Sequence, residues 1–177
     1  MSEPFNPDTE LSEFLRQGAG RDWAEEAAED EAQSEMLRQR RLDLPTVAAD
    51  AAHRGDRATA EIGANVISGA ILATGTDYAT IQLSEQVADV RLTAASWSFI
   101  STNVSVDATA SGMSFVGLMK EHAAANARLR IELDNGQLVL GILRVVSADH
   151  LQVEDPDGRI AYVPIDRVCV MTRSTAH

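Results

Sequence analysis

Asp149 and His150 are the neighbouring side chains in this sequence that most resemble an acid–base pair. A histidine beside a carboxylate can relay a proton when both face a substrate. Here the pair stands at the start of an apolar segment that ends at Val153, where an aspartate commonly forms a turn. The position favours a turn-forming aspartate and a half-exposed histidine over a catalytic pair.

The other reactive side chains also occupy positions typical of structural residues. Cys169 lies inside an apolar run, which favours a buried small hydrophobe over a nucleophile. His122 shares a predicted helix face with Phe115 and Met119, which favours packing over metal binding. His53 suits a cation at a helix end. Without metal-ligand spacing, a phosphate-binding glycine loop or a nucleophile elbow, we expect no enzyme, metal or cofactor.

Composition places most of the negative charge in the first third of the chain. The 177 residues carry a net charge of −12, and residues 1–57 contribute 14 acids against 7 bases. Such a balance disfavours binding to nucleic acid, which needs clustered Lys and Arg. The single cysteine suits a reducing compartment. The sequence shows no export signal or membrane-spanning run, so we expect a cytoplasmic protein without a membrane partner.

Residues 1–42 form a predicted acidic helical arm. Its carboxylates lack the glycine and the alternating spacing of a calcium-binding loop, so they fit a solvated helix face. They are Glu25, Glu26, Glu29, Asp30 and Glu31. Trp23 on this polar helix has two interpretations: an anchor that docks the arm on the rest of the chain, or a hot spot for a partner.

The remaining chain repeats one pattern at an interval of about 72 residues. A short helix and five strands are predicted twice, over residues 43–101 and 114–173, with a linker at 102–113. Matching positions are Gly69 and Gly141, Asp77-Tyr78 and Asp149-His150, Ile81 and Val153, Ala48–Ala52 and Lys120–Ala124, and, at 71, Ile100 and Met171. An interval shared by a helix, a strand glycine and a strand start indicates an internal duplication.

Local signals place the ends of these elements. Pro45 suits the first helical position and Gly55 the residue after the helix. Ser114 can cap the second helix, and Asn126 suits its end. The first five strands are predicted at 57–62, 66–73, 79–83, 87–92 and 97–100. A glycine inside a strand, as at Gly69, often marks the bend of a small barrel.

The second unit resembles the Sm-like (LSm) barrel in Ile131–Gly136, Leu140–Leu143 and Ser147–Val153. Its closing segment, Tyr162–Val170, is similar to the last strands of bacterial SH3-like barrels. The whole pattern is also similar to uncharacterised actinobacterial helix-plus-barrel proteins, a likeness that brings no activity with it. The resemblance implies a mainly β chain with helices (α+β): two tandem five-stranded SH3/Sm-like barrels, each preceded by a short helix.

The resemblance does not extend to a nucleic-acid site. RNA-binding Sm-like proteins carry an aromatic or similar side chain two residues after the loop aspartate, and an asparagine shortly beyond. Leu151 and Val153 stand there in the second unit, and Ala79 and Ile81 in the first. The groups that would stack on a base or bind its edge are therefore missing.

Two functions follow. The first is a non-enzymatic interaction or assembly module that binds a protein partner or itself. Its candidate partner-binding residues are Trp23, Asp77, Tyr78, Asp149 and His150. The alternative is an RNA- or DNA-binding regulatory protein of Sm-like type. Its candidate contacts are Arg128, Arg130, Arg144 and Arg159.

Overall fold

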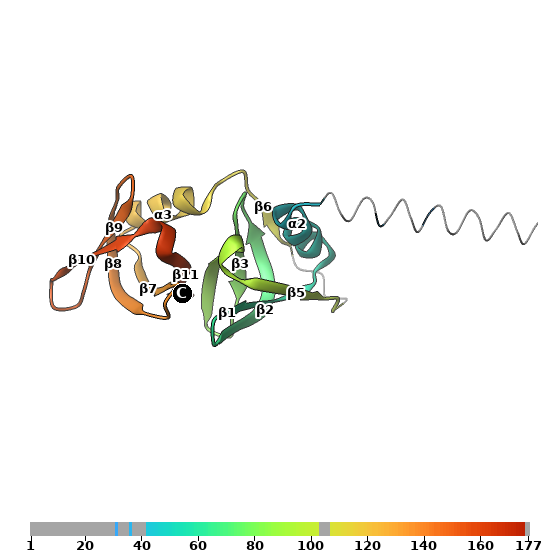
Figure 1. Cartoon of the computed structure of the whole chain (residues 1–177), viewed down its shortest axis with the longest axis horizontal. Helices are drawn as coiled ribbons and strands as arrows, with labels where there is room; N and C mark the ends of the chain where they lie inside the picture. Colours follow the sequence, from blue (N-terminus) through green and yellow to red (C-terminus); the bar gives the residue numbers. More distant parts are fainter. Residues whose placement is uncertain (1–30, 32–35, 37–41, 103–106, 176–177) are drawn as a thin grey trace, which may run out of the picture. The chain divides into compact units, whose positions relative to one another are not determined.

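A computed structural model describes residues 31, 36, 42–102 and 107–175. The chain divides into two compact units, Met1–Leu42 and Asp43–His177. Trp23 and almost all of the predicted acidic arm lie outside the described residues. The second unit contains the strands and helices discussed below (Figure 1).

The second unit contains the same order of elements twice. The first set consists of α2 (Leu44–Arg54), β1 (Arg57–Ile62), β2 (Asn65–Thr74), β3 (Tyr78–Gln82), β4 (Gln86–Arg91), the 3₁₀ turn η1 (Leu92–Ala94) and β5 (Ser96–Ile100). The second set consists of α3 (Phe115–Ala124), β7 (Arg128–Leu133), β8 (Leu138–Val146), β9 (His150–Glu154), β10 (Ile160–Pro164), η2 (Ile165–Arg167) and β11 (Val168–Ser174). Between them, the short strand β6 (Thr109–Ala110) pairs in parallel with β2, inside the segment predicted as a linker.

The strands of both sets form one sheet of 11 strands, in which each set contributes a run of five neighbouring strands. Their order is β10-β9-β8-β7-β11-β4-β3-β2-β1-β5, with β6 off this path beside β2. The two runs meet where β4 pairs antiparallel with β11 of the second set. The mainly β, α+β class is confirmed.

Capping residues start both helices within one residue of the predicted positions. Ser114 caps α3 as predicted, whereas Asp43 caps α2, so that Leu44 and not Pro45 is its first residue. The Asp43 carboxylate accepts a hydrogen bond from the Thr46 amide at 3.0 Å, and Gly55 ends α2 in the left-handed conformation with φ of 73°. The Ser114 hydroxyl accepts from the Gly117 amide at 3.2 Å. Each helix then lies against the long second strand of its own set, α2 on β2 and α3 on β8.

The two strand glycines sit where the backbones approach most closely. A Cβ on Gly69 would lie 1.9 Å from the Gln82 carbonyl oxygen, and one on Gly141 would lie 2.3 Å from the Glu154 carbonyl oxygen. Shortly after each glycine the register with the next strand shifts, which is the mark of a β-bulge. The predicted bend therefore occurs in β2 and in β8.

The strand pairing corrects one predicted match between the sets. Ala60 of β1 lies opposite Trp97, and Ile131 of β7 lies opposite Met171. Because Ala60 and Ile131 hold the same place in their sets, Met171 corresponds to Trp97 and not to Ile100. One extra residue in the β7–β8 turn, one in the β9–β10 turn and one at the bulge of β11 lengthen the interval towards the end of the second set.

The two hydrophobic cores share side chains across the sets. Tyr78 of β3 belongs to the core of the second set, with its ring centroid 6.1 Å from that of Phe115. Cys169 and Val170 of β11 belong to the core of the first set. Cys169 is buried, as the sequence predicts, and this burial raises the pKa of its thiol. The sets therefore stabilise one another.

Candidate functional site

The junction of β4 and β11 joins the two strand sets. Five residue pairs run from Val90 opposite Val170 to Gln86 opposite Ser174. Neighbouring contacts extend the junction: the Arg91 guanidinium donates to the Ile165 carbonyl at 2.7 Å. This junction holds the most buried polar cluster of the described chain.

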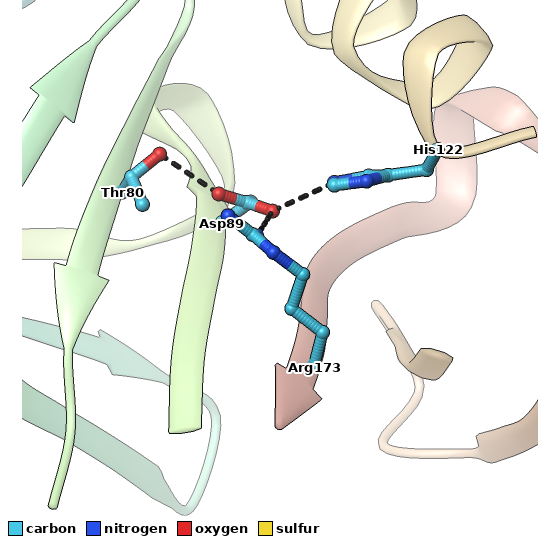
Figure 2. Close-up of polar contacts among 4 residues, drawn as sticks. All are labelled: Thr80, Asp89, His122 and Arg173. Atoms are coloured by element: carbon cyan, nitrogen blue, oxygen red, sulfur yellow. Dashed lines mark hydrogen bonds and ion pairs between the residues drawn. The ribbon is translucent and has the colours of Figure 1, made fainter. Parts of the chain in front are cut away.

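Asp89 is the centre of that cluster and is fully buried. One carboxylate oxygen accepts a hydrogen bond from the Thr80 hydroxyl at 2.8 Å. The other accepts from His122 Nε2 at 3.0 Å and from Arg173 Nη1 at 2.6 Å. Figure 2 shows the three donors converging on the carboxylate from β3, α3 and β11.

Electrostatics explains why the carboxylate has three donors. A buried charge costs several kcal/mol of solvation unless an opposite charge and hydrogen bonds replace water. Arg173 supplies the positive charge, and Thr80 and His122 satisfy the remaining acceptor sites. Because Asp89 belongs to the first set while His122 and Arg173 belong to the second, the cluster fixes one set against the other.

The cluster is enclosed between the two sets, and its contacts join them. Its histidine nitrogen and its hydroxyl both donate to a carboxylate that has almost no contact with solvent. A search of the residues that the structure describes found no group of three or more His, Cys, Asp or Glu that could hold a metal ion.

The first predicted partner-binding pair, Asp77 and Tyr78, has structural contacts. The Asp77 carboxylate accepts from the Phe115 amide at the start of α3. The Tyr78 ring is only 3% exposed, and burial raises the pKa of its phenol. Both residues therefore connect β3 to the second set, and Tyr78 presents no ring to a partner.

The second pair, Asp149 and His150, lies at the surface. His150 Nδ1 is 2.7 Å from the Asp149 carboxylate, and this hydrogen bond lowers the pKa of Asp149. The His150 ring also lies 5.5 Å from the Tyr162 ring. Both residues line an open cavity of about 580 Å³, the other lining residues being Arg91, Ala148, Pro164, Ile165 and Asp166.

The four predicted nucleic-acid contacts lie on β7 (Arg128 and Arg130), on the neighbouring strand β8 (Arg144) and just before β10 (Arg159). Arg144 is held by Glu154 at 2.7 Å and also donates to Asn126. Arg159 lies 3.6 Å from Asp157. Arg128 and Arg130 are exposed on β7. Two of the four positive charges therefore have a carboxylate beside them.

The two ends of the sheet carry exposed apolar side chains. β10 and β5 each pair with one strand only among the residues placed by the structure. On β10, Ile160 is 43% exposed and Tyr162 is 67% exposed. On β5, Ile100 is 60% exposed. Neither strand contains a charged residue.

Sequence reasoning missed the Asp89 cluster and the free strand edges. The available signal for the cluster was an aspartate inside the otherwise apolar segment Val87–Val90, which indicates a buried carboxylate with a partner. Nothing local identifies that partner, because Arg173 follows 84 residues later.

No protein-family model matches the chain, and no curated protein sequence is significantly similar to it. Within the described part of the second unit, no helix is long and apolar enough to cross a membrane.

Proposed function

We propose that the chain is an interaction and assembly module that binds its partner by strand addition at β10 and β5. The observation that supports this proposal is the chemistry of the two end strands. Natural sheets usually protect an edge with charged residues, proline, a bulge or a covering segment. β10 contains Pro164 at its end and no charged residue, and β5 contains neither a charged residue nor a proline. β10 reads Ile-Ala-Tyr-Val-Pro and β5 reads Ser-Trp-Ser-Phe-Ile, and both expose apolar side chains.

The proposal includes an internal duplication of an Sm/SH3-like element. The repeated order of elements, the paired strand glycines and their bulges all support it. β4 and β11, the fourth strand of the first set and the last strand of the second, already pair within the chain. β10 and β5 are the corresponding strands of the opposite sets, and each pairs with one strand only among the described residues. Main-chain hydrogen bonds would supply affinity, and side chains on alternate positions would supply specificity.

Edge and non-edge substitutions in the full chain test this function. Tyr162→Lys and Ser98→Lys each place a charge on an exposed position of an end strand. Leu140→Lys is the matched control, because Leu140 is 57% exposed but lies on β8, which has a neighbour on both sides.

Association is measured by sedimentation of the purified protein and by retention of proteins from an extract of the source cells. We expect both edge variants to lose association that the Leu140→Lys variant keeps. If all three variants associate as the unsubstituted protein does, strand addition is the wrong function.

A further inference from the structure

We infer that the outward face of β8 binds an amphipathic helix of another protein, and that this helix carries acidic residues along one side. The apolar residues of this surface, the β8 face, are Leu138, Leu140, Ile142 and Val145. β8 lies inside the sheet and not at its end, so this binding is independent of strand addition at β10 and β5.

β8 is apolar on both of its faces. Its sequence, Leu-Val-Leu-Gly-Ile-Leu-Arg-Val-Val, has a single charged residue, a pattern typical of strands that are covered on both sides. One face is covered, since Val139, Leu143 and Val146 pack in the core of the second set. On the other face, Leu138 is 45% exposed and Leu140 is 57% exposed. Exposed apolar patches of this kind mark interaction sites.

The corresponding face of the first set is polar. Ser68 of β2 holds the place of Leu140, because it lies opposite Thr59 as Leu140 lies opposite Arg130, and both of these are the third residue of their strand. The Ser68 hydroxyl lies 3.0 Å from the Thr59 hydroxyl and accepts a hydrogen bond from Arg57 at 3.2 Å. The repeated architecture therefore does not require an apolar face here, and the second set alone has one.

Two arginines of β7 lie beside the β8 face. Arg128 is opposite Ile142, and Arg130 is opposite Leu140. Neither guanidinium forms an ion pair with another described residue, in contrast to Arg144, which lies 2.7 Å from a carboxylate. Two positive charges along one side of an apolar stripe favour a partner with carboxylates on that side.

A surface hollow of about 400 Å³ combines both kinds of contact. It is lined by Arg128, Gly141, Ile142, Glu154, Asp155 and Pro156. Both carboxylates in it are already engaged, since Glu154 accepts from Arg144 and Asp155 accepts from two amides of its own turn. Arg128 is therefore the charge in the hollow that a partner can neutralise, while Ile142 and Pro156 can contact an apolar side chain.

The backbone of β8 determines that the partner is a helix. β8 pairs with β7 on one side and with β9 on the other, so a partner reaches it through side chains only. Such a partner has to satisfy its own backbone hydrogen bonds, which an α-helix does. Leu138 to Val145 spans about 23 Å at about 3.3 Å per residue. A helix of about 15 residues, or four turns, has the same length.

A second copy packed face to face would not match the charges. It would bring two further arginines to the interface, while Glu154 is already paired with Arg144 and Glu132 accepts a hydrogen bond from Asn65. Arginines buried without a carboxylate partner oppose association. An acidic helix supplies the negative charges that a second β8 face lacks.

Two synthetic peptides and the full chain test this inference. The acidic probe is a fluorescent helix of about 15 residues with leucine at positions i, i+3, i+4 and i+7 and glutamate along one side. The matched probe carries lysine in place of each glutamate. Fluorescence anisotropy measures the binding of each probe at low and at high salt. We expect the acidic probe to bind and the lysine probe not to bind.

Substitutions then locate the binding surface. Leu140→Lys should weaken binding of the acidic probe by about tenfold or more. Arg130→Gln should weaken it and reduce its dependence on salt. Val66→Lys is the matched control, because Val66 is 64% exposed and holds the place of Leu138 on β2, and this variant should bind as the unsubstituted chain does. Thermal unfolding checks the fold of each variant, and the exposed Arg130 provides the test if Leu140→Lys does not fold.

Several results would overturn the inference. Equal binding of both probes, or of neither, refutes the acidic helix. A loss with Val66→Lys as large as that with Leu140→Lys places the binding elsewhere. Binding of anionic lipid vesicles through Leu140 and Arg130, without binding of the acidic probe, assigns the face to a membrane. If the acidic probe binds only after residues 1–42 are removed, the occupant belongs to the chain itself and the external partner is wrong.

The same variants separate this surface from the end strands. Ser98→Lys should lose association at the sheet edge and keep binding of the acidic probe. Leu140→Lys should lose the probe and keep association at the edge. Failure of one result therefore leaves the other standing.

Discussion

Replacing Asp89 by alanine should destabilise the second unit strongly, because it removes the acceptor of three hydrogen bonds. The three donors differ in how far water can replace the lost carboxylate. His122 and Thr80 are buried and cannot turn to water, whereas the Arg173 side chain is 34% exposed and can recover part of its solvation. Breaking a buried ion pair by removing one partner costs about 3 to 5 kcal/mol. The partial exposure of Arg173 places our expectation at the lower end, about 3 kcal/mol.

A surface ion pair of similar geometry provides the control. Arg144 and Glu154 approach to 2.7 Å, with side chains 38% and 33% exposed. Because exposed pairs contribute only about 0.2 to 1 kcal/mol, Glu154→Ala should lower the free energy of unfolding by at most about 1 kcal/mol. Removing the carboxylate should therefore lower the free energy of unfolding severalfold more at Asp89 than at Glu154.

Urea unfolding at neutral pH, followed by circular dichroism, measures both variants. A loss of about 3 kcal/mol is a large share of the 5 to 15 kcal/mol typical of a domain, so the fraction folded in water must be checked first. A double-mutant cycle with Arg173→Met then isolates the pair itself. If Asp89→Ala costs no more than Glu154→Ala, the cluster does not hold the sets together and our account of the junction is wrong.

Four further predictions concern a strand glycine, the buried thiol, a surface carboxylate and nucleic-acid binding. Gly69→Ala should lower the thermal midpoint, since its Cβ would clash with a carbonyl of β3, whereas Gly112→Ala, which meets nothing within 4 Å, should not. The Cys169 thiol, with its raised pKa, should resist alkylation until the protein is unfolded in urea. The hydrogen bond from Arg167 lowers the pKa of Asp134 in the folded protein. Ionised Asp134 therefore stabilises the fold at any pH above its unfolded-state pKa, and this stabilisation is lost as the pH falls through its lowered folded-state pKa. Asp134→Asn should flatten this acid dependence of the melting temperature. Finally, neither the full chain nor one lacking residues 1–42 should retard RNA or DNA in a gel at low salt, and a salt-dependent shift would favour the nucleic-acid alternative.

Local chemistry made the elements of the second unit predictable from the sequence. Pro45 and Ser114 act at the start of a helix through their own backbone and side chain, and Gly69 bends its strand through a contact with the next strand. Each of these signals depends on residues close in sequence. The strands and helices predicted from them are present with boundaries shifted by one to a few residues, whereas the short strand β6 lies in the segment predicted as a linker.

Which strand would lie beside β4 was not predictable. The residues of β4 carry no local signal for its second neighbour, because that neighbour, β11, belongs to the other set. The choice depends on contacts such as that between Asp89 and Arg173, which are 84 residues apart. Tyr78 shows the same limit: the sequence makes it a candidate partner-binding residue, and in the structure its ring belongs to the core of the other set.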